Sequence, residues 1–200
     1  MLRKLFIFSA VLFFCAGTVS AQVVTGAVAP DFTLTDVKGN AYQLGSFKGK
    51  IVLLEWTNPD CPFVKKFYDA KAMQKWQADY TAKGVVWLSV NSSAVGKQGH
   101  YAPAELQARL SAEGFAGTAA LIDADGTVGR LYGAQTTPHI FIVDAAGKLV
   151  YQGAIDDKPG TSAADIDSAR NYAAAVLDQL LAGNPVTVES GKSYGCSVKY

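Results

Sequence analysis

The sequence has little charge, few cysteines and no internal repeat. Charged residues make up 18% of the 200 residues, and 18 basic and 17 acidic side chains leave a formal net charge of +1. A chain this close to neutral is not expected to bind nucleic acid or an anionic membrane surface. Three cysteines exclude a disulfide-dense miniprotein, and the composition excludes collagen-like and low-complexity chains. Half of the residues are apolar, which at this length suffices for one buried core.

An apolar run near the N-terminus predicts a leader rather than a membrane anchor. It spans 5–16, follows the bases Arg3 and Lys4, and leads into small residues that end at Ala21. This order is typical of a secretory signal peptide. Crossing a bilayer takes roughly 20 apolar residues, more than this run contains. We predict a signal peptide over 1–21 that is cleaved off, a periplasmic or secreted protein, and no stable membrane insertion after cleavage.

The cysteines give the first indication of chemistry. Cleavage removes Cys15 and leaves Cys61 and Cys196. Lipidation of Cys15 is not expected, because Phe14 stands before it where a lipoprotein signal has a small residue. Two thiols in an exported protein enter a compartment in which disulfides form and persist.

The remaining chain reads as a linker over 22–30, one domain over 31–183 and a tail over 184–200 that carries Cys196. Periodicity and turn residues predict, in chain order, a β-hairpin over 31–44, a buried strand over 51–54, a helix from 61 to 84, a buried strand over 85–90, an amphipathic segment over 103–114, a short strand over 119–122, a hairpin over 139–152 and a helix that includes 166–181. Strands that alternate with helices and end in an antiparallel hairpin favour an α/β fold with a mixed sheet.

Cys61 stands where a helix is expected to begin. Proline is favoured at the first helical position, so Pro62 would make Cys61 the N-cap. The free N–H groups of Phe63 and Val64 and the helix dipole would then favour the thiolate over the thiol. A lowered thiol pKa is what makes a cysteine nucleophilic near neutral pH.

Neighbouring charges act in both directions on this predicted thiolate. Lys65 and Lys66 in the first helical turn would add to the effect if they faced the sulfur, and Asp60 opposes it. The alternative interpretation is structural, because a free cysteine often serves as a small apolar plug in a core.

Four stretches of the sequence are distinctive: residues 61–65 (CPFVK), 137–141 (TPHIF), 150–157 (VYQGAIDD) and 195–200 (GCSVKY). With these stretches the chain resembles the peroxiredoxin-like redoxins, which are related to AhpC/TSA proteins within the thioredoxin-like superfamily. The resemblance covers nearly all of 28–200. It implies a thioredoxin-like fold, in which a mixed β-sheet is flanked by helices and carries an N-terminal β-hairpin extension.

The resemblance also implies roles for four residues. Cys61 is the implied nucleophile, and Thr137-Pro138 stands where such folds hold a cis proline beside the nucleophile and bind an extended substrate. Cys196 is the hypothetical resolving cysteine, which would attack an oxidised Cys61 and form a Cys61–Cys196 bridge. A permanent structural disulfide between the same two sulfurs is the alternative.

Two departures limit what the resemblance implies about the reaction. Val64 stands where thioredoxins have a second cysteine, and Asn58 stands where peroxiredoxins have a threonine. The substrate, a protein thiol or disulfide or a peroxide, therefore stays open, and so does the redox partner. No zinc-type ligand spacing is present, so neither a metal nor another cofactor is expected. His139 has no assigned role, and the Asp156-Asp157 pair is interpreted as a solvated loop.

These observations lead to two hypotheses from different classes. The first is an exported thiol-based oxidoreductase, a thiol–disulfide oxidoreductase or a peroxiredoxin-like protein, with Cys61 as nucleophile and Cys196 as its partner. The second is a non-catalytic binding module that keeps the thioredoxin fold and holds a structural Cys61–Cys196 disulfide. The amount of reactive thiol on the native protein distinguishes them.

Overall fold

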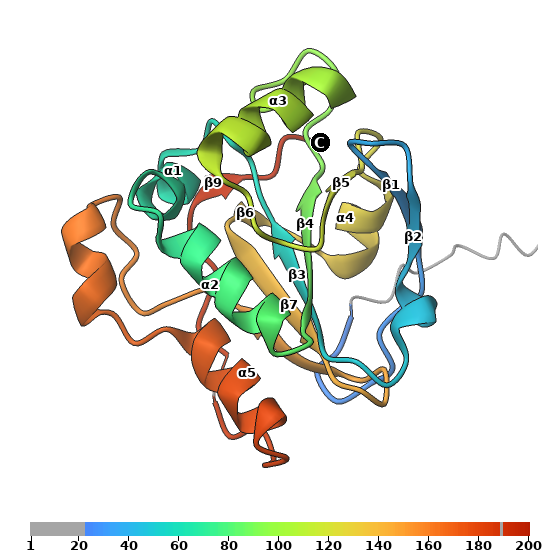
Figure 1. The fold of residues 1–200 in the computed structure, drawn as a ribbon, viewed down its shortest axis with the longest axis vertical. Helices are drawn as coiled ribbons and strands as arrows, with labels where there is room; N and C mark the ends of the chain where they lie inside the picture. Colours follow the sequence, from blue (N-terminus) through green and yellow to red (C-terminus); the bar gives the residue numbers. More distant parts are fainter. Residues whose placement is uncertain (1–22, 189) are drawn as a thin grey trace, which may run out of the picture.

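A computed structural model describes residues 23–188 and 190–200, so the predicted leader over 1–21 lies outside the described residues. Seven strands form a mixed sheet in the order β2-β1-β5-β4-β3-β7-β8, and β6 and β9 form a separate two-stranded sheet (Figure 1). The strands are β1 (Thr33–Asp36), β2 (Ala41–Gln43), β3 (Val52–Trp56), β4 (Val86–Asn91), β5 (Ala119–Ile122), β6 (Thr136–Thr137), β7 (His139–Val143), β8 (Leu149–Gly153) and β9 (Cys196–Ser197).

The predicted mixed sheet and both predicted hairpins are confirmed. β3 pairs in parallel with β4, and β4 pairs in parallel with β5. The hairpin β1-β2 extends this parallel centre at one edge, through antiparallel pairing of β1 with β5. The hairpin β7-β8 extends it at the other edge, through antiparallel pairing of β7 with β3.

Helices cover both faces of the sheet (Figure 1). They are α1 (Pro62–Asp69), α2 (Ala72–Ala82), α3 (Pro103–Glu113), α4 (Thr127–Tyr132) and α5 (Tyr172–Leu181), with 3-10 turns η1 (Leu44–Phe47) and η2 (Ala163–Ser168). In the view of Figure 1, α1, α2 and α5 gather on one side and α4 lies on the other. Within the described residues, no helix combines the length and apolarity needed to cross a membrane.

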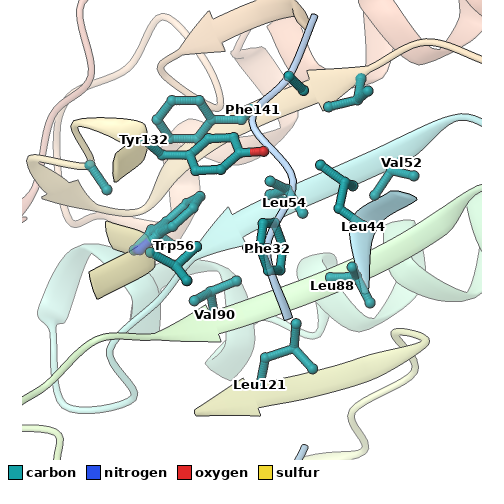
Figure 2. Close-up of a cluster of buried hydrophobic side chains, with 14 of the residues drawn as sticks. Phe32, Leu44, Val52, Leu54, Trp56, Leu88, Val90, Leu121, Tyr132 and Phe141 are labelled. Atoms are coloured by element: carbon teal, nitrogen blue, oxygen red, sulfur yellow. The ribbon is translucent and has the colours of Figure 1, made fainter. Parts of the chain in front are cut away.

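The side chains of β3 alternate between the two faces of the sheet and contribute to a hydrophobic cluster on each face. Leu54 and Trp56 point to the face of α4, where they pack with Phe32, Tyr132 and Phe141 (Figure 2). The intervening side chains point to the face of α1, α2 and α5. On that face a second cluster contains Cys61. Side chains of a strand alternate between faces, so a strand that is buried on both sides reads as a continuous apolar run.

Two predicted helices are corrected by the structure. The helix expected over 61–84 is two helices, because the chain turns at Lys71, whose φ is +60°. The final helix begins at Tyr172, later than predicted, where the Asn171 side chain accepts a capping hydrogen bond from the N–H of Ala174 at 2.8 Å. Of the apolar positions before Asn171, Ile166 lies in η2 and Ala169 directly follows it, and their spacing mimics the helical period.

Helix α4 was not predicted, because its sequence is rich in glycine. Gly126 and Gly133 flank it with left-handed backbones, and Gly129 lies inside it. The Asp123 carboxylate accepts hydrogen bonds from the N–H groups of Val128 and Gly129, at 3.1 and 2.8 Å. A side-chain acceptor for these unpaired amides stabilises a helix that its propensities disfavour.

The segments predicted as linker and tail both lie against the domain. Near the start, Gly26 donates to the carbonyl of Leu149 at 2.7 Å, and Ala29 donates to that of Gly147 at 2.9 Å. At the end, the chain returns from α5 along the molecule to β9, which lies beside β6 (Figure 1).

Candidate active site

Cys61 is the N-cap of α1, as predicted, with Pro62 at the first helical position. Its backbone is extended, with φ −73° and ψ 125°, and its side chain is 0% exposed. The N–H groups of Val64 and Lys65 are donated to the carbonyl of Cys61, at 3.0 and 2.9 Å. The sulfur therefore lies at the positive end of the helix and inside the protein.

Thr137 and Pro138 face Cys61, and the peptide bond between them is cis. The Cys61 thiol donates to the carbonyl oxygen of Thr137, with 3.1 Å between sulfur and oxygen. Among the described residues, the buried hydroxyl of Thr137 has no hydrogen-bond partner. The loop thus presents both an acceptor and an unused donor beside the sulfur.

Cys196 also lies at this point, although it is far away in the sequence. Strand β9 pairs antiparallel with β6, and in this register Cys196 is opposite Thr137. Both cysteines are free thiols, Cys61 buried and Cys196 partly exposed. The four residues singled out by the sequence, Cys61, Thr137, Pro138 and Cys196, thus meet in one place.

The two thiols have opposite tendencies to ionise. Burial opposes ionisation of Cys61, but hydrogen bonds from the Cys196 thiol, Thr137 and the N–H groups of Cys196 and Val64 outweigh it and lower the pKa of Cys61. Burial and the hydrogen bond to Cys61 raise the pKa of Cys196 to about 11. Of the two thiols, Cys61 is therefore the one that ionises more readily.

Asp60 and Lys66, two of the charges flanking Cys61, are engaged elsewhere. Burial opposes ionisation of Asp60, but hydrogen bonds from Arg109 and Tyr101 lower its pKa overall. The Arg109 guanidinium lies 2.7 Å from the carboxylate of Asp60, so the repulsion expected from this residue is offset. Lys66 is buried and directed at Asp156 and the carbonyl of Lys158, not at the sulfur.

We call residues 190–200 the strap, because they cross the site and are attached on both sides of Cys196. On one side, the N–H of Ala154 donates to the carbonyl of Gly191 at 3.0 Å. The Tyr194 hydroxyl donates to Asp156, and its ring packs against Phe63 with centroids 6.1 Å apart.

The far end of the strap is fixed by Tyr200. Its ring lies where side chains of Gly126 and Gly129 would be, since a Cβ at either residue would come within 2.6 Å of it. The Arg130 guanidinium lies 4.4 Å from the ring centre, and the Tyr200 hydroxyl donates to the carbonyl of Ala134 at 2.8 Å. These glycines therefore form a slot for the terminal tyrosine.

The solvated-loop interpretation of Asp156-Asp157 is wrong for Asp156. Asp156 is 2% exposed and lies 3.5 Å from the ammonium group of Lys66, whose side chain is also buried. Asp157 is exposed, as expected, and accepts from the N–H of Arg170 at 2.9 Å. A buried charge needs a partner, and Lys66 was not recognised as one because 90 residues separate it from Asp156.

His139, to which the sequence assigned no role, is a buried residue of β7. Its ring packs on Phe141 with centroids 4.4 Å apart, and its Nδ1 accepts from the N–H of Gln135 at 3.3 Å. Burial lowers the pKa of His139 to about 4, so the ring is neutral near pH 7. Within the described part of the chain, no three His, Cys, Asp or Glu side chains form a metal-binding group.

Glu55 was missed by the sequence analysis. It lies in β3, is 0% exposed, and accepts hydrogen bonds from Trp87 at 2.9 Å and Ser89 at 2.8 Å. Burial raises the pKa of Glu55 despite these donors. The available signal was an acid within a run of apolar residues, a position that a carboxyl group occupies only with hydrogen-bond partners.

Comparisons with known proteins agree with this arrangement. The model of the AhpC/TSA family matches residues 25–152. The chain is 30% identical over 144 residues to the thiol-disulfide oxidoreductase ResA of Geobacillus kaustophilus, and the alignment covers 66% of this chain and 70% of that protein.

Solved structures extend the similarity over more of the chain. A hypothetical protein from Sinorhizobium meliloti is 30% identical, with a TM-score of 0.74, over 90% of this chain and 96% of that chain. The thioredoxin domain of a thiol-disulfide oxidoreductase from Bacteroides vulgatus is 23% identical, with a TM-score of 0.51, over 74% and 98%. The predicted thioredoxin-like fold is confirmed.

Proposed function

The chain belongs to the AhpC/TSA family, and on that premise we propose that it is a thiol–disulfide oxidoreductase whose redox pair is Cys61 and Cys196. The observation that carries the proposal is the contact between a buried thiol of lowered pKa and a second thiol across the Thr137-Pro138 loop. A thiolate is the nucleophile of disulfide exchange, and a neighbouring thiol completes the two-electron step.

The reaction is a transfer of two electrons and two protons. A substrate disulfide R–S–S–R is reduced to two thiols, and the Cys61–Cys196 dithiol is oxidised to a disulfide. An external thiol then returns the pair to the dithiol form. The protein needs no cofactor for this, because both redox equivalents are stored in its own sulfurs.

Peroxide is the less supported substrate. The amide of Asn58, which replaces the threonine of peroxiredoxins, accepts from the N–H of Asp60 at 2.9 Å and donates to the carbonyl of Gln98 at 3.2 Å. A Cβ on Gly99 would come within 2.1 Å of this amide, so its position is closely confined. Asn58 holds the loop and supplies no hydroxyl group for a peroxide beside the sulfur.

The proposed place of action is outside the cytoplasm, and the proposed substrates are protein thiols and disulfides. The leader expected over 1–21 supports export. The similarity to ResA supports disulfides as the substrate class. A nearly neutral surface offers no long-range electrostatic preference for nucleic acid.

Turnover of a protein disulfide by the reduced protein tests the proposal. We expect Cys61→Ser to reduce turnover to the uncatalysed rate, because the exchange then lacks its thiolate. Cys196→Ser should also stop turnover, because no Cys61–Cys196 bridge can then form. Ser193→Ala is the matched control, since it changes another small strap residue and removes no sulfur.

Two other outcomes would count against the proposal. Turnover that persists in Cys61→Ser would contradict the proposed pair. A wild-type protein whose thiols react only slowly and only at alkaline pH would instead support the binding module with a structural disulfide.

A further inference from the structure

The strap gives the two sulfurs unequal access to a substrate. Cys61 is 0% exposed, and Cys196, which lies across it, is partly exposed. Tyr194 of the strap also packs on Phe63 in the first turn of α1. A molecule approaching from solvent therefore meets Cys196 first.

The strap also occupies the strand edge at which an extended substrate was expected. β9 pairs with β6, and Thr137 is opposite Cys196 in this register. The approach is so close that a Cβ on Gly195 would lie 2.1 Å from the carbonyl oxygen of Thr137. A second polypeptide strand has no room on this edge while β9 is in place.

Opening the strap would break contacts on both sides of Cys196. On one side the bond from Tyr194 to Asp156 would be lost. On the other side Val198 donates to the carbonyl of Gln135 at 3.0 Å, and Ala94 donates to that of Lys199 at 2.7 Å. Attack on Cys196 leaves all of these contacts in place, whereas attack on Cys61 requires their loss.

We propose, as an extension that rests on the proposed function, that Cys196 is the sulfur that exchanges with the substrate and that Cys61 is an internal partner. In the oxidised protein an incoming thiolate RS⁻ attacks the Sγ of Cys196. An R–S–S–Cys196 bond forms, the Cys61–Cys196 bond breaks, and its electron pair leaves on the sulfur of Cys61. One thiolate is consumed and one is produced.

The surroundings of Cys61 suit a leaving group. Thiols of lower pKa leave faster in disulfide exchange, and the hydrogen bonds around Cys61 lower its pKa. The Thr137 hydroxyl, one of these donors, has no competing partner and can donate to the charge that forms there. In the reverse direction the Cys61 thiolate attacks the mixed disulfide at Cys196 and releases RS⁻. Cys61 is therefore still a nucleophile, and the sulfur that it attacks is that of Cys196 in the mixed disulfide.

The site of the first mixed disulfide tests this inference. The full chain is oxidised with diamide, mixed briefly with glutathione, quenched in acid and digested with trypsin. Cys61 then lies in the peptide 51–65 and Cys196 in the peptide 193–199. At early times we expect about a tenfold excess of glutathione on Cys196 over Cys61, because access and leaving-group pKa favour the same sulfur.

A variant that displaces the strap provides the second arm. Gly195→Ala places a Cβ against the carbonyl of Thr137, so the share of glutathione on Cys61 should rise. Gly147→Ala is the matched control, because Gly147 also has a positive φ but has open space around its Cα.

An early adduct mainly on Cys61 in the wild-type protein would overturn this inference and leave the proposed function standing. A protein that forms neither the bridge nor an adduct on either cysteine would overturn both.

Discussion

Cys61 belongs to the sheet-and-helix body of the molecule, and Cys196 belongs to the strap that crosses it. The body determines the position of Cys61 through local structure, with Pro62 beginning a helix directly after the sulfur, and the strap contributes the hydrogen bonds from Cys196 that lower its pKa. The strap determines the position of Cys196 through contacts that are distant in sequence, among them those of Tyr194 and Tyr200. A low thiol pKa and access from solvent therefore belong to two different sulfurs here, whereas a single reactive cysteine would combine them.

The body and the strap are expected to differ in how well they tolerate substitutions. The body is held by large buried apolar clusters, one of which Figure 2 shows, so one lost contact is a small part of its stability. The strap is held by a few hydrogen bonds, the ring contacts of Tyr194 and Tyr200, and partly buried side chains such as Val198, so one substitution can loosen it. Changes in the strap should therefore alter reactivity while the fold persists.

The largest effect is expected at the buried ion pair of the body to which Tyr194 of the strap is bonded. Asp156→Asn removes the charge that compensates Lys66 and weakens the acceptor for Tyr194. Loss of one partner of a buried pair costs about 3 kcal/mol. We expect a loss of this order in urea unfolding and faster alkylation of Cys61 in the native protein.

Asp157→Asn is the matched control for this substitution, because the neighbouring carboxylate is exposed. If both variants lose the same stability, or if Cys61 stays equally protected in Asp156→Asn, then the ion pair does not hold the strap on the body.

A second effect of similar size should arise in the body alone. Burial holds the pKa of His139 at about 4, whereas an unfolded histidine titrates near 6.5. The unfolded chain thus binds more protons between these values, so the stability present above about pH 6.5 is lost as the pH falls towards 4. The difference corresponds to an order of 3 kcal/mol.

Urea unfolding at pH 7 and pH 5 measures the part of this loss that falls between these two values, about 2 kcal/mol. His139→Leu should have a flatter pH dependence than the wild type, because its side chain binds no proton. His100→Gln removes the other histidine and serves as the control. Equal slopes in the wild type and His139→Leu would show that His139 does not stay neutral on folding.

The smallest expected effect is a change in the pKa of Cys61 when its contact with the strap residue Cys196 is removed. The Cys196 thiol donates a hydrogen bond that lowers the pKa of Cys61. Cys196→Ala removes this donor, so the pKa of Cys61 should rise, as followed by thiolate absorbance against pH. Ser197→Ala, at an exposed neighbouring position, should leave the titration curve in place. A pKa that stays constant in Cys196→Ala would mean that the body alone lowers it.

The sequence predicted the parts of the fold and site that depend on local patterns. The N-cap at Cys61 follows from Pro62, and the hairpins follow from alternation and turn residues. The meeting of Cys61 with Thr137-Pro138 was available only through resemblance to a family, because nothing local relates residues so far apart.

The missed parts depend on contacts between distant segments. Asp156 looked solvated because its partner Lys66 is remote in sequence, and β9 was missed because two residues form a strand only against β6. The break at Lys71 was hidden because apolar residues continue on both sides of it. Such features follow from tertiary packing, which overrides local propensity.

A redox titration of the mature protein with peptide mapping under non-reducing conditions tests the central claim, that Cys61 and Cys196 form a redox pair. We predict one two-electron transition between the dithiol and a Cys61–Cys196 disulfide, with a potential between about −270 and −120 mV, the range of catalytic dithiols. Failure of the bridge to form under oxidising conditions would contradict the account. A bridge that persists below about −300 mV, as structural disulfides do, would contradict it as well.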